Sequence, residues 1–153
     1  MRVEQALLDA GLTTRVVELD QSTRTAELAA IALGVPLGSI VKSLIFMADG
    51  KPVLALVAGD RRAAPDKVAA ASGAIEARLA RADEVRSITG FAIGGVPPLG
   101  HDLPMAVLID QSLGRFATVN AAAGSPRAVF PVAFAELVRV SQGRICDVVE
   151  PGA

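Results

Sequence analysis

The stretch that decides the fold runs from Ser39 to Ala58 and reads SIVKSLIFMADGKPVLALVA. Two apolar runs, Ser39 to Met47 and Pro52 to Ala58, flank the pair Asp49-Gly50. An Asp-Gly pair between such runs is a strong signal for a β-hairpin, because both residues tolerate the positive φ angles of a tight turn. We predict an antiparallel hairpin whose two strands are largely buried.

Working outward from the hairpin, four segments begin or end at residues that commonly cap helices. The predicted helices are residues 3–10 before Gly11, residues 24–33 between Thr23 and Gly34, residues 65–72 from Pro65 to Gly73, and residues 82–88, whose first turn holds Asp83 and Glu84. A short strand is expected around Val16, Val17 and Leu19.

The second half of the chain mixes strands with a long loop. Residues 90–104 are rich in Gly and Pro and read as a loop. The predicted elements after it are strands over 105–109, 116–119 and 127–130, a helix from Pro131 through Leu137, and closing strands at 138–140 and 144–149. Strands and helices do not alternate strictly, so we expect an α+β fold rather than a doubly wound one.

Composition narrows the class of protein. The chain has 153 residues, of which 52% are hydrophobic and 20% charged, which fits one folded domain over residues 1–153 and excludes disorder. A single cysteine, Cys146, rules out an internal disulfide framework, and with a single histidine, His101, we expect no metal site and no cofactor.

Charge and hydropathy also limit the partners. No apolar run approaches the roughly 18 residues that span a membrane, and the N-terminus lacks the apolar region of a signal peptide. We therefore expect a cytoplasmic protein with no membrane partner. The net charge of −1 and the pI of about 5.8 do not indicate binding to duplex DNA.

Lys42 is the first candidate for chemistry. It lies inside the apolar run IVKSLIF at residues 40–46, and a buried ammonium must reach a partner, a ligand or water, because leaving it unpaired is costly. The alternative is that the side chain runs along the wet face of the strand with its ammonium in solvent.

The second candidate is the loop GGVPPLGH at residues 94–101. Its glycines allow close approach of the backbone and its prolines stiffen it, so it can present fixed N–H groups to a carbonyl or a phosphate. An ordinary rigid turn is the alternative. The spacing matches neither a Walker loop nor a dinucleotide-binding fingerprint.

Four further sites carry weaker signals. His101 could act as a general base or could be an exposed loop residue. Asp110 ends an apolar strand and could hold a ligand hydroxyl or cap the next turn. Cys146 reads as a small buried hydrophobe. The run Asp60-Arg61-Arg62 could contact phosphate or could be a solvated turn.

Taken in order, several motifs resemble one family. They are TAELAAIALGV at 25–35, IVKSLIF at 40–46, ALVAGDRR at 55–62, ITGFAIGGVPPLGH at 88–101, VLID at 107–110 and AAAGSP at 121–126. Together they cover roughly residues 20–140. The chain is identified as a member of the YbaK / prolyl-tRNA-synthetase-associated editing domain family, in its free-standing form.

The resemblance implies a curled mixed β-sheet surrounded by helices. It also implies hydrolysis of the ester that joins a wrong amino acid to the 3′-terminal adenosine of tRNA. Lys42 matches the critical lysine of such domains, and Gly94 and Pro98 are the ends of their critical Gly-x-x-x-Pro loop. We expect Gly95, Val96, Pro97, His101 and Asp110 to help bind the substrate.

The chain departs from the family pattern at one point. Some members carry a functional histidine near the segment that corresponds to residues 121–127, and this chain has none there. Gly124 or Ser125 is expected to occupy that space. A mechanism that depends on the histidine is therefore in doubt for this chain.

The chemistry also makes sense without the family. A synthetase that selects a small apolar amino acid gains only about 1–3 kcal/mol from one methylene, so smaller amino acids leak through and a second site must remove them. Together with the resemblance, this leads us to expect a deacylase that acts on Ala, Ser, Thr or Cys attached to tRNA, with tRNA-Pro as the first candidate, and that works with a synthetase.

Three alternatives stay open on sequence grounds. The chain could bind a tRNA end or an aminoacyl-adenosine without turnover, could be another esterase or amidase that uses His101, or could dock on a synthetase as an interaction module.

Overall fold

The computed structural model describes residues 2–19, 25–125 and 127–151. The helices are α1 (Arg2–Asp9), α2 (Ala26–Leu33), α3 (Pro65–Ser72), α4 (Ala82–Thr89) and α5 (Phe134–Ser141), with 3₁₀ turns η1 (Leu37–Ser39) and η2 (Gln111–Arg115). The strands are β1 (Val17–Glu18), β2 (Val41–Ala48), β3 (Lys51–Ala58), β4 (Ala77–Leu79), β5 (Ala106–Asp110), β6 (Thr118–Ala122), β7 (Ala128–Ala133) and β8 (Arg144–Cys146). The fold is α+β, as predicted.

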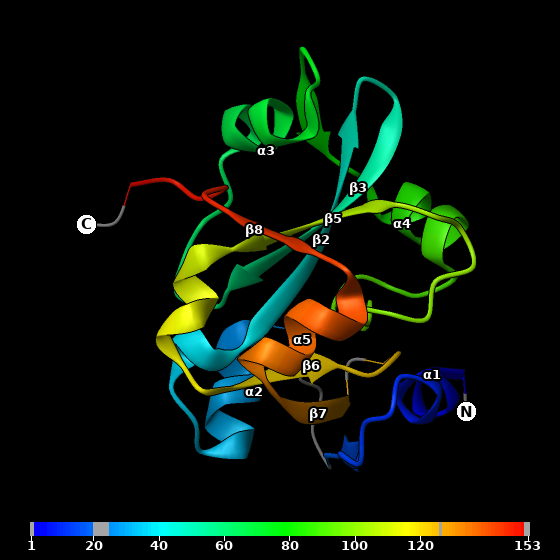
Figure 1. Ribbon diagram of the computed structural model, residues 1–153, viewed down its shortest axis with the longest axis vertical. Coiled ribbons are helices and arrows are strands. Elements are labelled where there is room, and N and C mark those ends of the chain that lie inside the picture. The colour runs from blue at the N-terminus through cyan, green and yellow to red at the C-terminus, as the bar shows by residue number, and fades with distance from the viewer. Residues whose placement is uncertain (1, 20–24, 126, 152–153) are drawn as a thin grey trace.

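The strands of the described chain lie in two sheets instead of one curled sheet. A mixed sheet has the order β4-β2-β3-β5-β8, and an antiparallel sheet has the order β1-β7-β6. A single parallel bridge between Ile40 and Asn120 links the two. In Figure 1 the β2–β3 hairpin runs along the middle of the molecule, with α3 and α4 toward its upper end and α1, α2 and α5 toward its lower end.

The predicted hairpin is confirmed. Strands β2 and β3 pair antiparallel from Val41 opposite Ala58 to Ala48 opposite Lys51. The connecting residues Asp49 and Gly50 have φ angles of 48° and 82°, as a two-residue turn with positive φ at both positions requires. This tight turn fixes the register and places Lys42 opposite Val57.

Strand β3 lies between β2 and β5 and has both faces covered. Every residue from Val53 to Ala58 is at most 4% exposed. One face, with Leu54 and Leu56, packs into the larger core beside α1, α5 and the second sheet, and the other face, with Val57, packs beside α3. The larger core therefore lies between the two sheets, and it sets their spacing.

Helix ends follow the predicted caps with one shift. Gly34 ends α2 in the left-handed conformation with φ 67°. The N-cap of α2 is Thr25, whose hydroxyl accepts a hydrogen bond from the amide of Leu28. The predicted cap, Thr23, lies outside the described residues. No helix in the described ranges is both long enough and apolar enough to cross a membrane.

The predicted last helix is present, but its predicted start at Pro131 and the predicted strand over 138–140 are wrong. Pro131 lies in β7 opposite Asn120 instead of opening a helix. Proline is tolerated there because β1 pairs only with Ala128 and Val129, which leaves the next part of that edge without a partner strand in the described chain. The last helix, α5, begins at Phe134 and takes in Val138 to Val140, which we expected to be a strand.

The last predicted strand is shorter than expected, and one strand was missed. Strand β8 covers only Arg144–Cys146 of the predicted 144–149, and it pairs parallel with β5. Strand β4 pairs with the hairpin end of β2. With three residues, of which two are exposed, β4 carries no alternating pattern that could have revealed it.

A truncation in β3 tests how much of the stability comes from this doubly covered strand. We expect Leu56→Ala to lower the free energy of unfolding by about 2–5 kcal/mol, because the side chain is fully buried and its removal leaves a cavity. The same substitution at Leu79, which is 55% exposed, is expected to cost about 0.5 kcal/mol. Urea unfolding of both variants checks this, and equal losses would contradict the assignment of β3 as the central strand.

Candidate functional site

A cavity of about 310 Å³ opens between the two sheets, close to the bridge between Ile40 and Asn120. Its walls come from α2, the first half of β2, the loop after α4, and strands β6 and β7. The lining is mostly small and apolar: Ala26, Ala29, Ile40, Val41, Leu44, Gly59, Ile93, Gly94, Val96, Ala121, Ala122 and Val129, with the polar residues Thr25, Glu27, Lys42, Ser43 and Asn120. This volume is at the small end of the range for ligand sites.

Lys42 lines this cavity from β2 and is half-buried. Its Nζ donates a hydrogen bond to the backbone carbonyl of Arg61. Burial lowers the pKa of the Lys42 ammonium below its ordinary value, while the nearby carboxylates of Glu27 and Asp60 act in the opposite direction. The side chain therefore has a fixed partner in the protein, and it is not simply extended into solvent.

The glycine-proline loop reaches the same cavity at its first residues. Gly94 and Val96 line the cavity, and Gly94 has a φ of 88°, a conformation that favours glycine. Loop and strand therefore bring Lys42, Gly94 and Val96 together, although about fifty residues of sequence separate Lys42 from the others.

The middle of the loop rests on the turn after β6. The carbonyl of Gly95 accepts a hydrogen bond of 2.9 Å from the amide of Gly124. A Cβ atom on Gly95 would lie 3.0 Å from the backbone of Ser125, so a larger residue would require the Ser125 backbone to shift. The structure thus brings Gly95, Gly124 and Ser125 together, as a support for the loop behind the lining of the cavity.

The end of the loop faces elsewhere. Pro98 and His101 line a separate hollow of about 240 Å³. The Nε2 atom of His101 lies 2.7 Å from the carbonyl oxygen of Pro97, and the imidazole meets the ring of Phe91 edge to face at 6.0 Å. Pro97 is buried. His101, Pro97 and Pro98 therefore are not in the lining of the cavity that holds Lys42.

Asp110 serves the fold. It is fully buried, and one carboxylate oxygen accepts hydrogen bonds from the amide and the hydroxyl of Ser112, at the start of η2. The other oxygen accepts from the amide of Val148 at 2.9 Å. Of the two sequence interpretations, the structure supports the cap, and the expectation that Asp110 holds a ligand hydroxyl is not supported.

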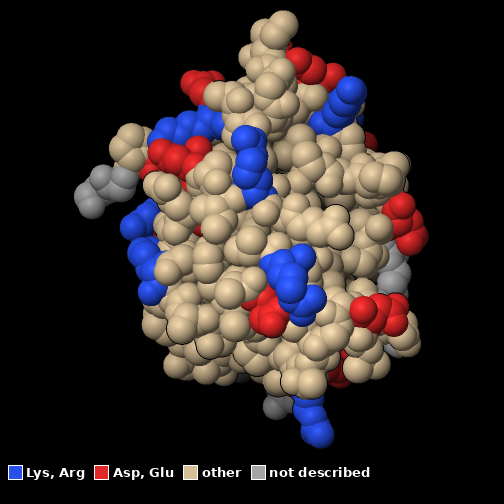
Figure 2. Space-filling view, viewed as in Figure 1, with Lys and Arg blue, Asp and Glu red and all other residues tan. Residues whose placement is uncertain are grey.

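The predicted basic patch is largely paired. Arg61 forms an ion pair with Asp60 at 3.3 Å, and Arg62 forms one with Glu150 at 3.7 Å. Acidic and basic side chains alternate over the face drawn in Figure 2 without a continuous basic area. The described residues contain no group of three or more His, Cys, Asp or Glu side chains arranged to hold a metal ion.

Sequence reasoning missed four polar residues of the cavity, namely Thr25, Glu27, Ser43 and Asn120. Glu27 lies in the first turn of α2, and Asn120 lies in β6 with its amide 3.4 Å from the hydroxyl of Ser39. Asn120 offered the same kind of signal as Lys42, a polar residue within an otherwise apolar strand. Glu27 offered none, because an acidic residue in the first turn of a helix is common.

A larger hollow of about 650 Å³ lies beside the hairpin turn and is lined by Asp49, Asp66 and Arg78, among others. The carboxylate of Asp49 accepts hydrogen bonds from the amides of Ile75 and Glu76, and these bonds lower its pKa. This carboxylate holds two segments of the chain together, which is a structural role. The candidate functional site is therefore the smaller cavity, which Lys42 and Gly94 line.

Comparison with known proteins shows the family that the sequence motifs predicted. Residues 20–140 match the family described as the aminoacyl-tRNA editing domain, and the chain belongs to this family. A crystallised protein that is proposed to be a trans-editing enzyme for prolyl tRNA synthetase is 42% identical, with a TM-score of 0.92 over 98% of this chain and 96% of that one.

Relatives of two sizes are found. The uncharacterised protein YwhH of Bacillus subtilis strain 168 is 35% identical over 85% of this chain and 83% of its own length. The proline–tRNA ligase of Solidesulfovibrio magneticus is 37% identical over 82% of this chain, but the match spans only 20% of the ligase. The same domain thus occurs in a protein of about this size and as a small part of a synthetase.

Proposed function

We propose that the chain is a trans-editing deacylase that hydrolyses the ester between a small amino acid and the 3′-terminal adenosine of tRNA, with tRNA-Pro as the first candidate. The observation that carries the proposal is the small apolar cavity that Lys42 and Gly94 both line. The family, and the similarity to a part of the proline–tRNA ligase, support it.

The cavity suits the selection of a small side chain. Methyl and isopropyl groups line it, including those of Ala26, Ala122 and Val129. Such walls can accept a small amino acid such as Ala, Ser, Thr or Cys and exclude a larger one by contact, so that exclusion supplies the selectivity that the synthetase lacks.

The reaction needs positioning more than it needs a nucleophilic side chain. An aminoacyl ester is already activated, so water can attack its carbonyl carbon once that carbon is held in place. The bond between the carbonyl carbon and the ribose oxygen then breaks, and the proton of the water passes to the ribose oxygen, with a substrate hydroxyl helping to activate the water.

Two groups in the cavity wall, the loop from Gly94 and the Lys42 ammonium, are assigned the remaining roles in the reaction. We assign the loop from Gly94 the role of offering a backbone N–H group to the carbonyl oxygen as negative charge develops on it, an interaction worth about 2.7–4 kcal/mol per donor. The amide of Gly95 is not this donor, because it donates to the carbonyl of Ala92 at 3.0 Å. The Lys42 ammonium is assigned to bind the phosphate that joins the terminal adenosine to the preceding nucleotide, or to polarise the ester. Neither role requires the downstream histidine that some members of the family carry.

Removal of Lys42 tests this function directly. We expect wild-type protein to hydrolyse tRNA-Pro charged with one of Ala, Ser, Thr or Cys while sparing Pro, and Lys42→Ala to lower kcat/KM by about 100-fold or more, because the transition state loses a charged partner. Release of the labelled amino acid measures the rate.

The matched control is Lys51→Ala, because Lys51 is exposed at the start of β3, beside the hairpin turn. Its rate should equal that of wild type, and circular dichroism should show that both variants are folded. Full activity in Lys42→Ala would contradict the assignment. No hydrolysis of any charged tRNA by the folded wild-type protein would favour a binding module without turnover.

A second prediction concerns the loop. Gly94→Ala should lower deacylation by about 10-fold or more, because a side chain at a φ of 88° forces the backbone donors to shift. Gly73→Ala is the matched control, since Gly73 has a φ of 70°, ends α3 away from the cavity and has open space around it. Both variants carry similar backbone strain, so equal loss of activity in both would show that Gly94 acts only through stability.

A further inference from the structure

The ammonium of Lys42 is held by a turn that follows β3. Its acceptor is the carbonyl of Arg61, and the amide of Arg61 donates at 3.0 Å to the carbonyl of Ala58, which closes the turn. The amide of Gly59 in the same turn donates at 2.8 Å to the carbonyl of Ile40. The position of the Lys42 ammonium therefore depends on the position of the turn formed by residues 58–61.

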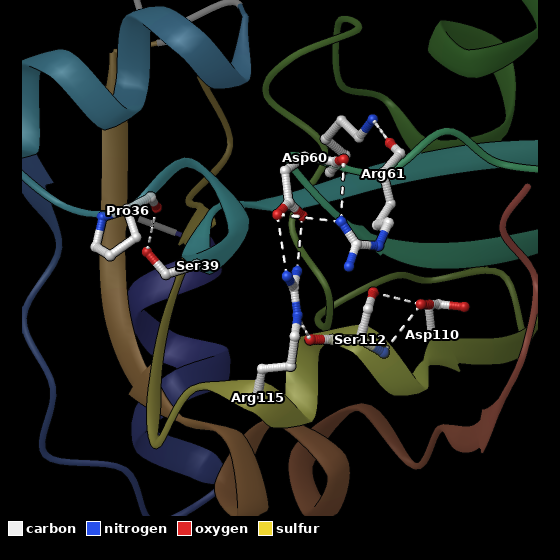
Figure 3. A network of polar contacts seen from close by, with 8 residues as sticks. Pro36, Ser39, Asp60, Arg61, Asp110, Ser112 and Arg115 are labelled. Atoms are coloured by element: carbon white, nitrogen blue, oxygen red, sulfur yellow. Dashed lines mark hydrogen bonds and ion pairs between the residues drawn. The ribbon is translucent and has the colours of Figure 1, made fainter. Parts of the chain in front are cut away.

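Asp60 anchors this turn from its other side. Its two carboxylate oxygens accept hydrogen bonds of 2.7 and 3.0 Å from the guanidinium of Arg115, and this pairing lowers the pKa of the Asp60 carboxyl. Figure 3 shows the two side chains meeting end to end, with Arg61 reaching the same carboxylate. Both members of the pair are partly buried, with side-chain exposures of 36% for Arg115 and 29% for Asp60.

Arg115 is itself held in place. Its Nε donates at 2.6 Å to the carbonyl of Ser112, and its guanidinium lies 5.1 Å from the centre of the Phe116 ring. A Cβ atom on Gly38 would lie 2.9 Å from both the Arg115 guanidinium and the Asp60 carboxylate. The ion pair thus packs closely against η1.

The network continues to the C-terminal segment through Asp110. Asp110 binds Ser112 through one oxygen and the amide of Val148 through the other. The amide of Glu150, two residues further on, donates at 2.8 Å to the carbonyl of Arg62. The turn is therefore held on one side by the Asp60–Arg115 pair and on the other by the bond between Glu150 and Arg62. Both connections lead to the buried carboxylate of Asp110.

From this geometry we propose that the Asp60–Arg115 ion pair positions the Lys42 ammonium for deacylation, by fixing the Arg61 carbonyl that accepts its hydrogen bond. Asp60 and Arg115 are positioning residues, since neither lines the cavity. The inference rests on the proposed function of Lys42. A pair that served stability alone would have no effect on Lys42.

Two variants break the pair in different ways. Asp60→Asn removes the carboxylate charge, and Arg115→Gln keeps that charge but removes the guanidinium. The charged groups acting on Lys42 are Glu27, Asp60 and Arg62, so the two variants change its electrostatic surroundings differently. If deacylation falls in both variants, the cause is therefore a displacement of the Lys42 ammonium and not a change in the charge near it.

The matched control is Glu84→Gln. Glu84 and Arg78 form a bidentate ion pair of the same kind, with distances of 2.7 and 2.8 Å, between β4 and α4. Neither residue lines the cavity, so loss of this pair should leave deacylation unchanged.

The first readout does not depend on activity. The chain has three lysines, Lys42, Lys51 and Lys67, so ¹⁵N-labelled ammonium groups can be assigned by NMR with single lysine variants. In Asp60→Asn and in Arg115→Gln we expect the Lys42 ammonium protons to exchange with water several-fold faster than in wild type. In Glu84→Gln the exchange rate should not change.

The second readout is the deacylation rate on the misacylated tRNA. We expect kcat/KM to fall by about 10- to 100-fold in both variants and to stay at the wild-type value in Glu84→Gln, because small displacements of a catalytic group have effects of this size. An unchanged Lys42 exchange rate in both variants would overturn the proposal, and so would faster exchange with undiminished deacylation. An inactive wild-type protein would instead refute the proposed function, and the exchange measurement would still decide whether the pair positions Lys42.

Discussion

The register of the β2–β3 hairpin is the constraint on which the rest of the structure depends. Strand β3 is covered on both faces, so each of its residues has one allowed orientation, and a slip by one position would turn every side chain to the opposite face. The two-residue turn at Asp49-Gly50 fixes the same register locally. As a result Lys42 lies opposite Val57, close to the turn that supplies its acceptor.

Oxygen atoms near the Lys42 ammonium offset part of the cost of its burial. Burial alone would disfavour the charged form, and the carbonyl of Arg61 with the carboxylates of Glu27 and Asp60 opposes that effect. The structure thus has a cation beside an apolar cavity at the junction of the two sheets. That combination suits the hydrolysis of an activated ester with a small acyl group, where placement and charge matter more than acid–base exchange.

Local signals in the sequence were sufficient for the hairpin, most helix ends and the two main candidates for the site. Asp49-Gly50 and Gly34 act through their own backbone conformations, so their effect is visible without knowledge of contacts. Lys42 was found because it interrupts an apolar strand, and Gly94 because it begins a loop rich in Gly and Pro. The same local logic failed at Pro131, where an unpaired edge of β7 tolerates a residue that usually opens a helix.

Contacts between distant segments could not be predicted in this way. Asp110 is buried and accepts hydrogen bonds from the amides of Ser112 and Val148. Its sequence context fits a ligand site and a cap equally well. His101 is the last residue of the predicted loop, yet it lines a different hollow. The Asp60–Arg115 pair joins residues 55 positions apart, so only the fold reveals it.

We propose that the cavity lined by Lys42 and Gly94 receives the aminoacyl end of tRNA. The most direct measurement is an NMR titration with a non-hydrolysable 3′-alanylamido-adenosine, which carries the amino acid and the terminal nucleoside without the rest of the tRNA. We predict saturable shifts at the backbone amides of Lys42, Gly94 and Val96, with His101 unaffected. Saturable shifts gathered around His101 instead, or none at all in the folded protein, would contradict the account.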